Sequence, residues 1–551
     1  MGNKQFRGQR QPAPTAMGRH GRIRTPTRTV TISAVALALA SVVVMQTGVQ
    51  AAPSSAPTPR PATVTYTGGK LSYSPDSLGN TIPDFSAAGY RGGRAALPQA
   101  PVAVRVQAKA SGDDTRRIQA AIGQVAKRAA DAGGIRGAVL LGPGIFRVTA
   151  GIQLASGVVL RGSGTSAGGT RLQALGTPGS LIRVGSDAAY TRTGTRATIS
   201  DPYVPVGATT LSVDKPASFT VGEQIVVQRP TTQEWIHAIG MDTIAGGDSW
   251  RPNSGILAVR TITAVKNKTL TLDAPLTTAI DNKYGGGTVW HYTLHGQVTE
   301  AGVENLSADA TAFTQDPNYG RPSGGKNSEA GAFASRLITI DAARDVWVRN
   351  VRLTHFGSGF YVNDNASRVT IERADDLNMV VPARLAPPPA FMIGGQQVLV
   401  QDTTVTGDHI HAWTTQSFAA GPNVFTHGTA TSLSGGHVDA GPHMKWGSGT
   451  LYDQLAIKGN DSAFIVANAA DGGTGHGWQG ANNVFWNTSA ATYTIQAPPT
   501  ADNWAFGPTG QQVPGKHDAE LPTKPALGTI VSPGRPVTPA SLFDQQVLER
   551  R

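Results

Sequence analysis

The sequence predicts an all-β protein built as a parallel β-helix, a single-stranded solenoid of short stacked strands. Two observations favour this class. Runs of three to five apolar residues alternate with glycine-rich turns too often for an ordinary meander, and in the second half such runs recur every 23 to 33 residues, a spacing typical of one coil. The 551 residues also include 66 Gly and no Cys. The lack of Cys excludes a disulfide scaffold, thiol catalysis and a Cys-ligated metal centre.

The first 51 residues have the pattern of an export signal. They contain seven Lys or Arg and no acidic residue, and the apolar run 32–44 and a small-residue site ending at Ala51 follow. This order is that of a secretory signal peptide, with an uncleaved membrane anchor as the alternative. Removing these seven charges from the formal +11 leaves about +4 on the rest of the chain, which indicates no nucleic-acid partner. We therefore expect a secreted, extracellular protein without stable membrane insertion after cleavage.

The next elements are predicted in chain order. Residues 52–97 begin rich in Pro, Ser and Ala, which predicts a linker and a disordered segment. Residues 98–200 are expected to form the first coils, preceded by a short capping helix with Asp114 as its N-cap. That helix is predicted by apolar residues at helical spacing and ends before a glycine pair: Ile118, Ala121, Ile122 and Val125, then Gly133 and Gly134.

Residues 201–292 interrupt the short-strand pattern. They contain four longer alternating runs, at 208–213, 224–228, 261–265 and 269–272, which predict a small inserted antiparallel β subdomain. Residues 293–514 are expected to form the main coils and the active cleft. The tail 515–551 is Pro-rich and ends in residues 540–551, a candidate helix that we expect to cap the solenoid.

Several motifs of the first predicted coils resemble a known family. They are Asp113-Asp114-Thr115, Ile118-Gln119-Ala120-Ala121-Ile122, Val139-Leu140-Leu141-Gly142-Pro143-Gly144 and Leu160-Arg161-Gly162-Ser163-Gly164. This string resembles the pectate-lyase-like superfamily of secreted proteins, and the likeness reaches from about residue 105 to 512. It implies a right-handed parallel β-helix and a polysaccharide substrate. Blocks such as Gly441-Pro442-His443-Met444-Lys445-Trp446 resemble a bacterial subgroup without a settled activity, so the resemblance assigns no catalytic residue.

Histidine and tryptophan concentrate in the predicted main coils. Six of the twelve His lie in residues 409–476, and five of the nine Trp lie in or near the same window. Residues one coil apart stack a strand spacing of about 4.8 Å from each other, so we expect these side chains to line one lateral cleft. Trp413, Trp446 and Trp478 are the predicted sugar platforms, with His411 and His437 beside them. The structural alternative is that these rings pack the coils together.

Cleavage by β-elimination is the favoured reaction. It needs a base near the C5 proton of a uronate and a cation beside its carboxylate. His443 and Lys445 could divide these roles because positions i and i+2 of a strand face the same way. His409 or His476 would be the second proton carrier. The expected function is that of a secreted polysaccharide lyase acting on a uronate-containing polymer.

Three alternatives remain open. A glycoside hydrolase of the same fold would use paired carboxylates, for which Asp408 and Asp439 lie about one coil apart. The protein could also be a non-catalytic glycan-binding or cell-surface module. A third possibility is a metal site formed by His409-x-His411 with His437-x-Asp439-x3-His443. No metal ligand is assigned, a divalent ion such as calcium remains possible as a cofactor, and the oligomeric state is left open.

Overall fold

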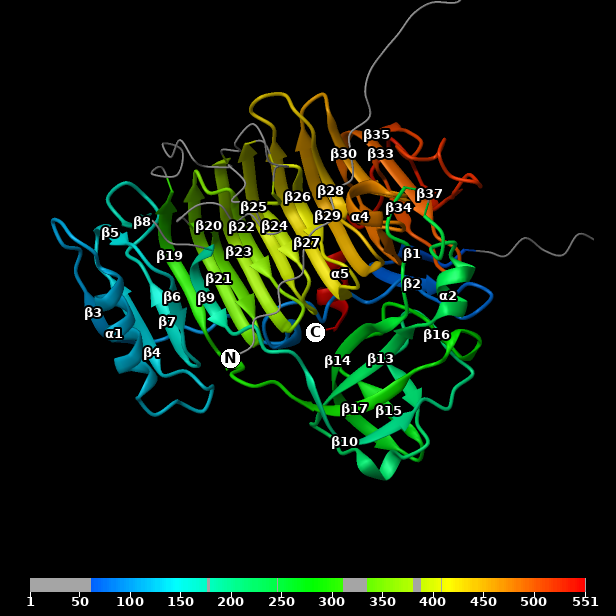
Figure 1. Ribbon diagram of the computed structural model, residues 1–551, viewed down its shortest axis with the longest axis horizontal. Helices are drawn as coiled ribbons and strands as arrows, with labels where there is room; N and C mark the ends of the chain where they lie inside the picture. Colours follow the sequence, from blue (N-terminus) through cyan, green and yellow to red (C-terminus); the bar gives the residue numbers. More distant parts are fainter. Residues whose placement is uncertain are drawn as a thin grey trace, which may run out of the picture. The chain divides into compact units, whose positions relative to one another are not determined.

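The computed structural model describes residues 61–175, 179–244, 246–310, 334–379, 388–407 and 409–550. All of them belong to one compact unit, Pro59–Arg551. They form a right-handed parallel β-helix with an inserted antiparallel subdomain (Figure 1). The predicted export signal, residues 1–51, lies outside the described residues. Within the described ranges, no helix is both long and apolar enough to cross a bilayer.

The coils consist of three stacks of parallel strands. The first stack comprises β3 (Val102–Val106), β4 (Gly137–Leu141), β7 (Val158–Arg161), β19 (Gly302–Asp309), β21 (Ala343–Thr354), β23 (Ala366–Met379), β25 (Leu399–Gly407), β27 (Ala420–Thr431), β29 (Gly447–Lys458), β32 (Val484–Trp486), β34 (Trp504–Phe506) and β37 (Thr529–Val531). The long strands of this stack, which are β19, β21, β23, β25, β27 and β29, each bend at a residue with positive φ, such as Asn305 or Asn350. Beyond the bend they continue the second stack, which begins with β5 (Gly144–Val148) and β8 (Thr170–Ala174).

The third stack carries the surface on which the candidate site lies. It comprises β6 (Ile152–Leu154), β9 (Gly179–Gly185), β20 (Ala334–Asp341), β22 (Ser358–Val362), β24 (Phe391–Ile393), β26 (His411–Thr415), β28 (Val438–Pro442), β30 (Ser462–Val466) and the second half of β33 (Ser489–Ala497). Each strand pairs in parallel with the strand one coil away. A side chain in this stack therefore has its sequence-distant counterpart directly beside it.

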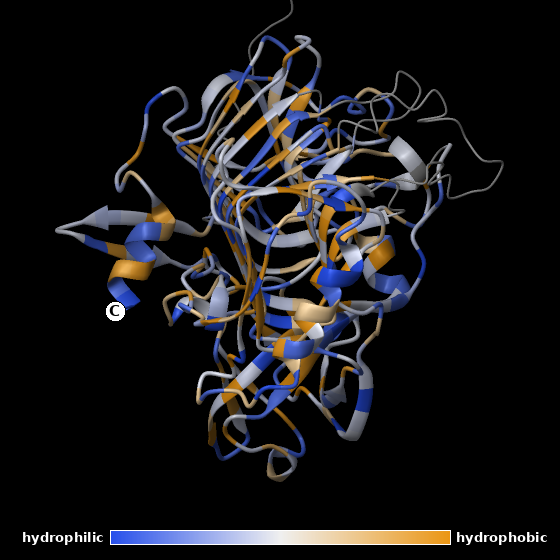
Figure 2. Ribbon diagram, turned by 90° about the vertical axis from the view of Figure 1, so that its left-hand side faces the viewer, coloured by the Kyte–Doolittle hydropathy of each residue, from blue (hydrophilic) through white to orange (hydrophobic). Residues whose placement is uncertain are grey.

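The recurring apolar runs predicted from the sequence stack in register inside the coils. The inward ladder of the first stack runs through Val348, Ile371, Val400, Phe425, Tyr452 and Phe485. The rings of Tyr452 and Phe485 are parallel, with centroids 4.8 Å apart. Hydrophobic residues recur along the strands throughout the coils (Figure 2). The predicted coil period is therefore confirmed, and the ladder forms the core that holds successive coils together.

Helix α1 (Thr115–Ala126) lies where the periodicity predicts a helix. Its buried face, which includes Ile118 and Val125, joins the core of the first coils. Asp114 occupies the N-cap position but its side chain makes no capping bond. Instead, Asp113 accepts hydrogen bonds from the backbone N–H of Thr115 at 3.0 Å and from its hydroxyl at 2.6 Å.

Residues 61–97 differ from the disordered segment expected there. They contain the hairpin β1 (Thr63–Thr67) and β2 (Lys70–Ser74) and the short helix η1 (Tyr90–Gly93). The C-terminal helix α5 (Leu542–Arg550) also differs from expectation, because it packs with this segment on the outer face of the first stack and does not cap the last coil. The physical reason is an outward apolar ladder that needs cover: Leu399, Val424, Leu451, Val484 and Trp504.

The inserted subdomain is a six-stranded antiparallel sheet. Its strand order is β10 (Thr191–Thr198), β17 (Thr288–Thr293), β13 (Gln224–Thr231), β14 (Asn253–Lys266), β15 (Thr269–Leu272) and β12 (Thr210–Ser212). The sheet begins at β10, before the predicted start at residue 201. Helix α2 (Gln233–Ala238) follows β13. The subdomain has its own apolar core, which also takes in Trp446 and Trp478 from the coils.

Candidate active site

A cavity of about 730 Å³ opens on the third stack beside β26, β28 and β30. Its polar lining comes from successive coils and from the segment after β35 (Thr509–Gln512): His411, His437, Asp439, His443, Asp461, Asn468, His476, Gln479, Thr492, Thr494, Lys516 and His517. Five of these residues are histidines. The cavity therefore gathers most of the imidazoles that the sequence predicts to share one flank.

A buried carboxylate lies between two imidazoles at the centre of this lining. His411 and Asp439 are register partners on β26 and β28, and Nδ1 of His411 is hydrogen-bonded to Oδ1 of Asp439. Nε2 of His437 lies 3.0 Å from Oδ2 of Asp439, and Nδ1 of His437 lies 2.9 Å from Oδ1 of Asp461. The coil spacing places these groups within hydrogen-bond reach.

The charges of this cluster follow from those contacts. Burial alone would raise the pKa of Asp439, but the charges and hydrogen bonds of His411 and His437 outweigh it and lower the pKa to about 2. The hydrogen bond to Asp439 raises the pKa of His437 to about 9, against the opposing effect of burial. At neutral pH Asp439 is ionised and His437 is protonated, so both nitrogens of His437 donate to carboxylates.

His443 is the neutral imidazole of the site. It follows β28, and the turn that contains it pairs with the turn one coil later, where the Lys445 N–H donates to the His476 carbonyl at 3.2 Å. The His443 ring centroid is 5.0 Å from that of His411 and 4.7 Å from that of His476. Burial, reinforced by His411 and His476, lowers the pKa of His443 to about 4. Burial, followed by the nearby charge of Lys445, also lowers the pKa of His476.

The two nitrogens of His443 differ in access. Nδ1 is buried and has no hydrogen-bond partner among the described residues. Nε2 is therefore the atom with which His443 can meet a molecule in the cavity. A neutral ring with a free nitrogen facing an open cavity can accept a proton.

Two residues predicted to take part in catalysis, His409 and Lys445, do not line the cavity. His409 is fully buried, with Nε2 3.5 Å from Oδ2 of Asp376, because it precedes β26 and does not share a strand face with His411. Lys445 is absent from the lining, although its charge helps to lower the pKa of His476. Asp408 lies outside the described residues. Of the predicted metal set, His411, His437, Asp439 and His443 line the cavity, whereas His409 does not.

The three tryptophans predicted as sugar platforms offer no exposed face. Trp413 is 0% exposed inside the coils, and its Nε1 donates to Thr403 Oγ1 at 3.1 Å. Trp446 packs edge-on against Trp235 of the insert at 4.8 Å. Trp478 donates from Nε1 to the Ile239 carbonyl at 3.0 Å. The expectation fails because the insert covers the turns that carry Trp446 and Trp478, and the sequence of the coils contains no sign of that cover.

Replacement of Trp446 should therefore weaken the fold and not sugar contact. We expect Trp446→Ala to lower the free energy of unfolding by about 3 to 5 kcal/mol, the usual cost of truncating a buried Trp. Leu433→Ala, at a side chain 60% exposed, is the control and should change little. Denaturant unfolding of both variants measures this. Unchanged stability combined with lost glycan affinity would restore the platform role.

Several residues that line the cavity were not among the residues predicted from the sequence. Lys516 and His517 line the cavity from the segment predicted to be a tail. Asn468 and Gln479 come from the loop between β30 and β32 (Val484–Trp486). Lys516 is exposed, and it is the only Lys or Arg among the described residues that line the cavity. No periodic apolar pattern marks either segment, so the position of these residues in the cavity could be found only from the structure.

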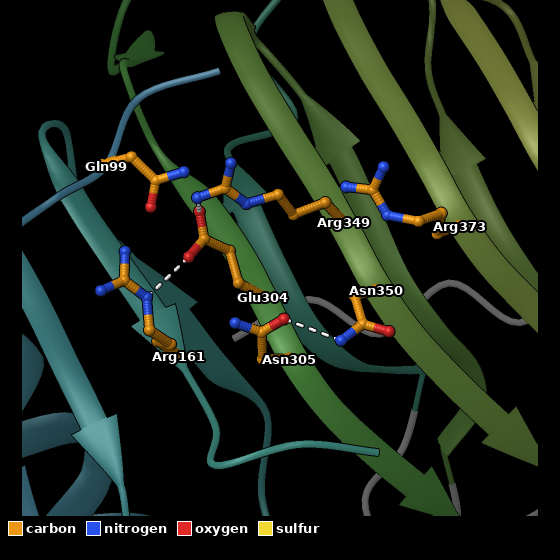
Figure 3. Close-up of a pocket in the computed structure, with 7 residues that line it drawn as sticks. All are labelled: Gln99, Arg161, Glu304, Asn305, Arg349, Asn350 and Arg373. Atoms are coloured by element: carbon orange, nitrogen blue, oxygen red, sulfur yellow. Dashed lines mark hydrogen bonds and ion pairs between the residues drawn. The ribbon is translucent and has the colours of Figure 1, made fainter. Parts of the chain in front are cut away.

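A second hollow, of about 510 Å³, lies on the first stack (Figure 3). Buried Glu304 accepts from Nε of Arg161 and from Nη2 of Arg349, both at 2.7 Å. The same two guanidinium groups also donate to the backbone carbonyls of Ala100 and Pro98. These groups anchor residues 98–100 on the coils. The histidine cavity therefore remains the better candidate for chemistry.

His437 and His443 should make the stability of the folded protein depend on pH in opposite directions. The folded pKa of His437, about 9, exceeds its ordinary 6.5, so its stabilisation is present below pH 6.5 and is lost as pH rises through 9. The folded pKa of His443, about 4, is below 6.5, so stability is lost as pH falls from 6.5 towards 4. Melting temperatures between pH 4 and 10 should show both losses, and His437→Gln should remove only the alkaline one. An unchanged alkaline loss would contradict the ion-pair assignment.

Comparison with known proteins gives a likeness of fold only. No protein-family model and no curated protein matches the chain. Similar solved structures include the tailspike gp49 from Pseudomonas phage LKA1 (12% identity, 72% of this chain, TM-score 0.41) and the polygalacturonase from Erwinia carotovora ssp. carotovora (12%, 81%, 0.36). Another is the Gp54 tailspike of Acinetobacter baumannii bacteriophage AP22 (12%, 76%, 0.39). The chain spans 56% of the first tailspike, 63% of the second and 96% of the polygalacturonase. The function has to be argued from the site itself.

Proposed function

We propose that this protein is a secreted carbohydrate-active enzyme that cleaves a uronate-containing polysaccharide by β-elimination in the histidine cavity. The observation that carries the proposal is the neutral, half-buried ring of His443, which lies between His411 and His476 and keeps Nε2 available. Such a group suits the removal of a weakly acidic proton from carbon. Export through residues 1–51 forms part of the same proposal.

The proposed elimination transfers one proton to His443 and one proton from His476. Nε2 of His443 takes the C5 proton of the uronate, the C4–O4 bond breaks, and a C4–C5 double bond forms. The departing oxygen takes a proton from His476, whose ring lies beside that of His443. In the free protein the pKa of His443 is about 4. A substrate carboxylate near both rings favours their protonated forms and raises the pKa of each towards neutrality. Binding of an anionic substrate therefore brings His443 and His476 into the pKa range in which they can exchange protons at neutral pH.

The substrate carboxylate needs a cation beside it, because its neutralisation makes the C5 proton acidic enough to remove. Lys445 was expected in this role, but Lys516 is the lysine that lines the cavity. Lys516 is exposed and sits in the loop that carries His517. We assign carboxylate neutralisation to Lys516, while Lys445 contributes at longer range through its effect on His476.

Hydrolysis by paired carboxylates is less well supported. It requires a carboxylic acid that is protonated at neutral pH, with a raised pKa. Asp439 and Asp461 are the carboxylates among the described residues that line the cavity. The pKa of Asp439 is lowered to about 2, and both carboxylates accept from the same protonated His437. Asp439 therefore does not supply the protonated carboxylic acid that hydrolysis requires.

A panel of uronate-containing and neutral polysaccharides tests the proposal. Ultraviolet absorbance of the unsaturated uronate and new reducing ends are followed together. We expect both signals to rise in parallel on a uronate polymer and neither on a neutral one. Reducing ends without absorbance would replace elimination by hydrolysis. Binding without either signal would make the protein a glycan-binding module.

A further inference from the structure

Two carboxylates and one imidazole converge beside the histidine cavity, outside the residues used above for chemistry. The donor atoms of Asp471, His517 and Glu520 all lie within 4.8 Å of one another. Nδ1 of His517 is 2.8 Å from Oε2 of Glu520 and 4.0 Å from Oδ1 of Asp471. We infer that these three side chains form a binding site for a divalent transition-metal ion such as Zn²⁺ or Mn²⁺.

The two segments that carry these donors are fixed by other contacts. Asp471 precedes α4 (Gly472–Gly475), and Trp250 of the insert donates from Nε1 to the Gly475 carbonyl at 3.3 Å. Asp518 accepts from the Gly515 N–H at 3.0 Å and from Gln496 Nε2 at 2.7 Å, which holds the loop before Glu520. The donors are therefore brought together by scaffold contacts that do not involve them. A preformed arrangement of this kind lowers the cost of binding an ion.

The ligand set selects the class of ion. One imidazole nitrogen with two carboxylate oxygens suits Zn²⁺, Mn²⁺ and related ions, whereas Ca²⁺ prefers oxygen ligands alone. Three protein donors also leave coordination positions open for water or for an oxygen of another molecule.

The location gives the ion access to a second molecule. His517 lines the histidine cavity, and Glu520 lines a neighbouring hollow of about 1000 Å³ between the insert and the C-terminal segment. An ion held here stands where the two hollows meet. Its open positions suit a carboxylate or hydroxyl pair of a saccharide that extends from one hollow into the other. This last step rests on the proposed function, whereas the metal site itself does not.

Calorimetric titration of the full chain, prepared without a histidine tag and freed of metal with a chelator, tests the site. We expect one Zn²⁺ per chain, weaker binding of Ca²⁺, and a rise in melting temperature on adding Zn²⁺. Glu520→Gln and His517→Ala should each weaken Zn²⁺ binding by more than about ten-fold. His237→Ala is the matched control, because the exposed His237 pairs with Asp242 on the insert and, among the described residues, has no second acid beside it.

Two results would overturn the inference. One is a wild-type chain that binds no Zn²⁺, as expected if the three groups form only an imidazolium paired with two carboxylates. The other is Zn²⁺ binding that survives both Glu520→Gln and His517→Ala. Because Glu520 is exposed, Glu520→Gln should fold even if His517→Ala does not. Retained Zn²⁺ binding without cleavage of any glycan would refute the proposed function and leave the metal site standing.

Discussion

Replacement of His443 by Gln should lower turnover by about 100- to 10,000-fold, the usual contribution of a positioned general base. Gln keeps a polar side chain of similar reach but cannot accept the C5 proton at Nε2. Substrate affinity should change little, because hydrogen bonding and charge in the cavity come mainly from His411, His437 and Lys516. Initial rates on the polymer identified by the panel, together with equilibrium binding of the same polymer, separate the two effects.

His295→Gln is the matched control for this variant. His295 is exposed near the edge of the insert and lies outside the cavity lining, so its replacement should leave turnover unchanged. A His443→Gln variant that retains its rate within a few-fold would contradict the base assignment. A variant that loses binding and turnover together would make His443 a contact residue instead.

Asp439→Asn should be the most disruptive change for the cluster as a whole. It removes the charge that pairs with His411 and His437, and breaking a buried ion pair costs about 3 to 5 kcal/mol of stability. The pKa of His437 should fall from about 9, because its largest cause is the hydrogen bond to Asp439. Turnover should drop as well, since His411 loses the contact that fixes its ring beside His443.

Asp375→Asn provides the comparison. Asp375 pairs with Arg352 at 3.3 Å on the exposed surface of the coils, where an ion pair contributes at most about 1 kcal/mol. Denaturant unfolding and activity are measured for both variants. An Asp439→Asn protein as stable and active as Asp375→Asn would show that the His411–Asp439–His437 cluster has no organising role.

The fold was predictable from the sequence because its signal is periodic. Apolar runs such as those around Val348 and Ile371 recur at the coil length, and each becomes a rung of one core ladder. The insert was predictable as well, because its strands are longer and alternate apolar with polar residues. The edge-to-face contact of His443 with His476 follows from the same period, so the centre of the candidate site could be located before the structure.

The rest depends on contacts that local patterns do not encode. Trp446 is covered by Trp235, more than two hundred positions away in the chain, and nothing near either residue indicates the meeting. Residues 61–97 resemble a linker by composition but cover an apolar ladder of the first stack. Lys516 and His517 enter the site on an irregular segment after β35. Charge, burial and loop placement in three dimensions decide which candidates reach the cavity.

The most direct test of the account is the titration of His443 itself. With ¹³C-labelled histidine, and His443→Gln to assign the signal, nuclear magnetic resonance follows protonation of this one ring. We expect a midpoint near pH 4 in the free protein and an upward shift when a uronate oligosaccharide is added. A midpoint at the ordinary value of 6.5 that does not respond to the oligosaccharide would contradict a buried, substrate-tuned base.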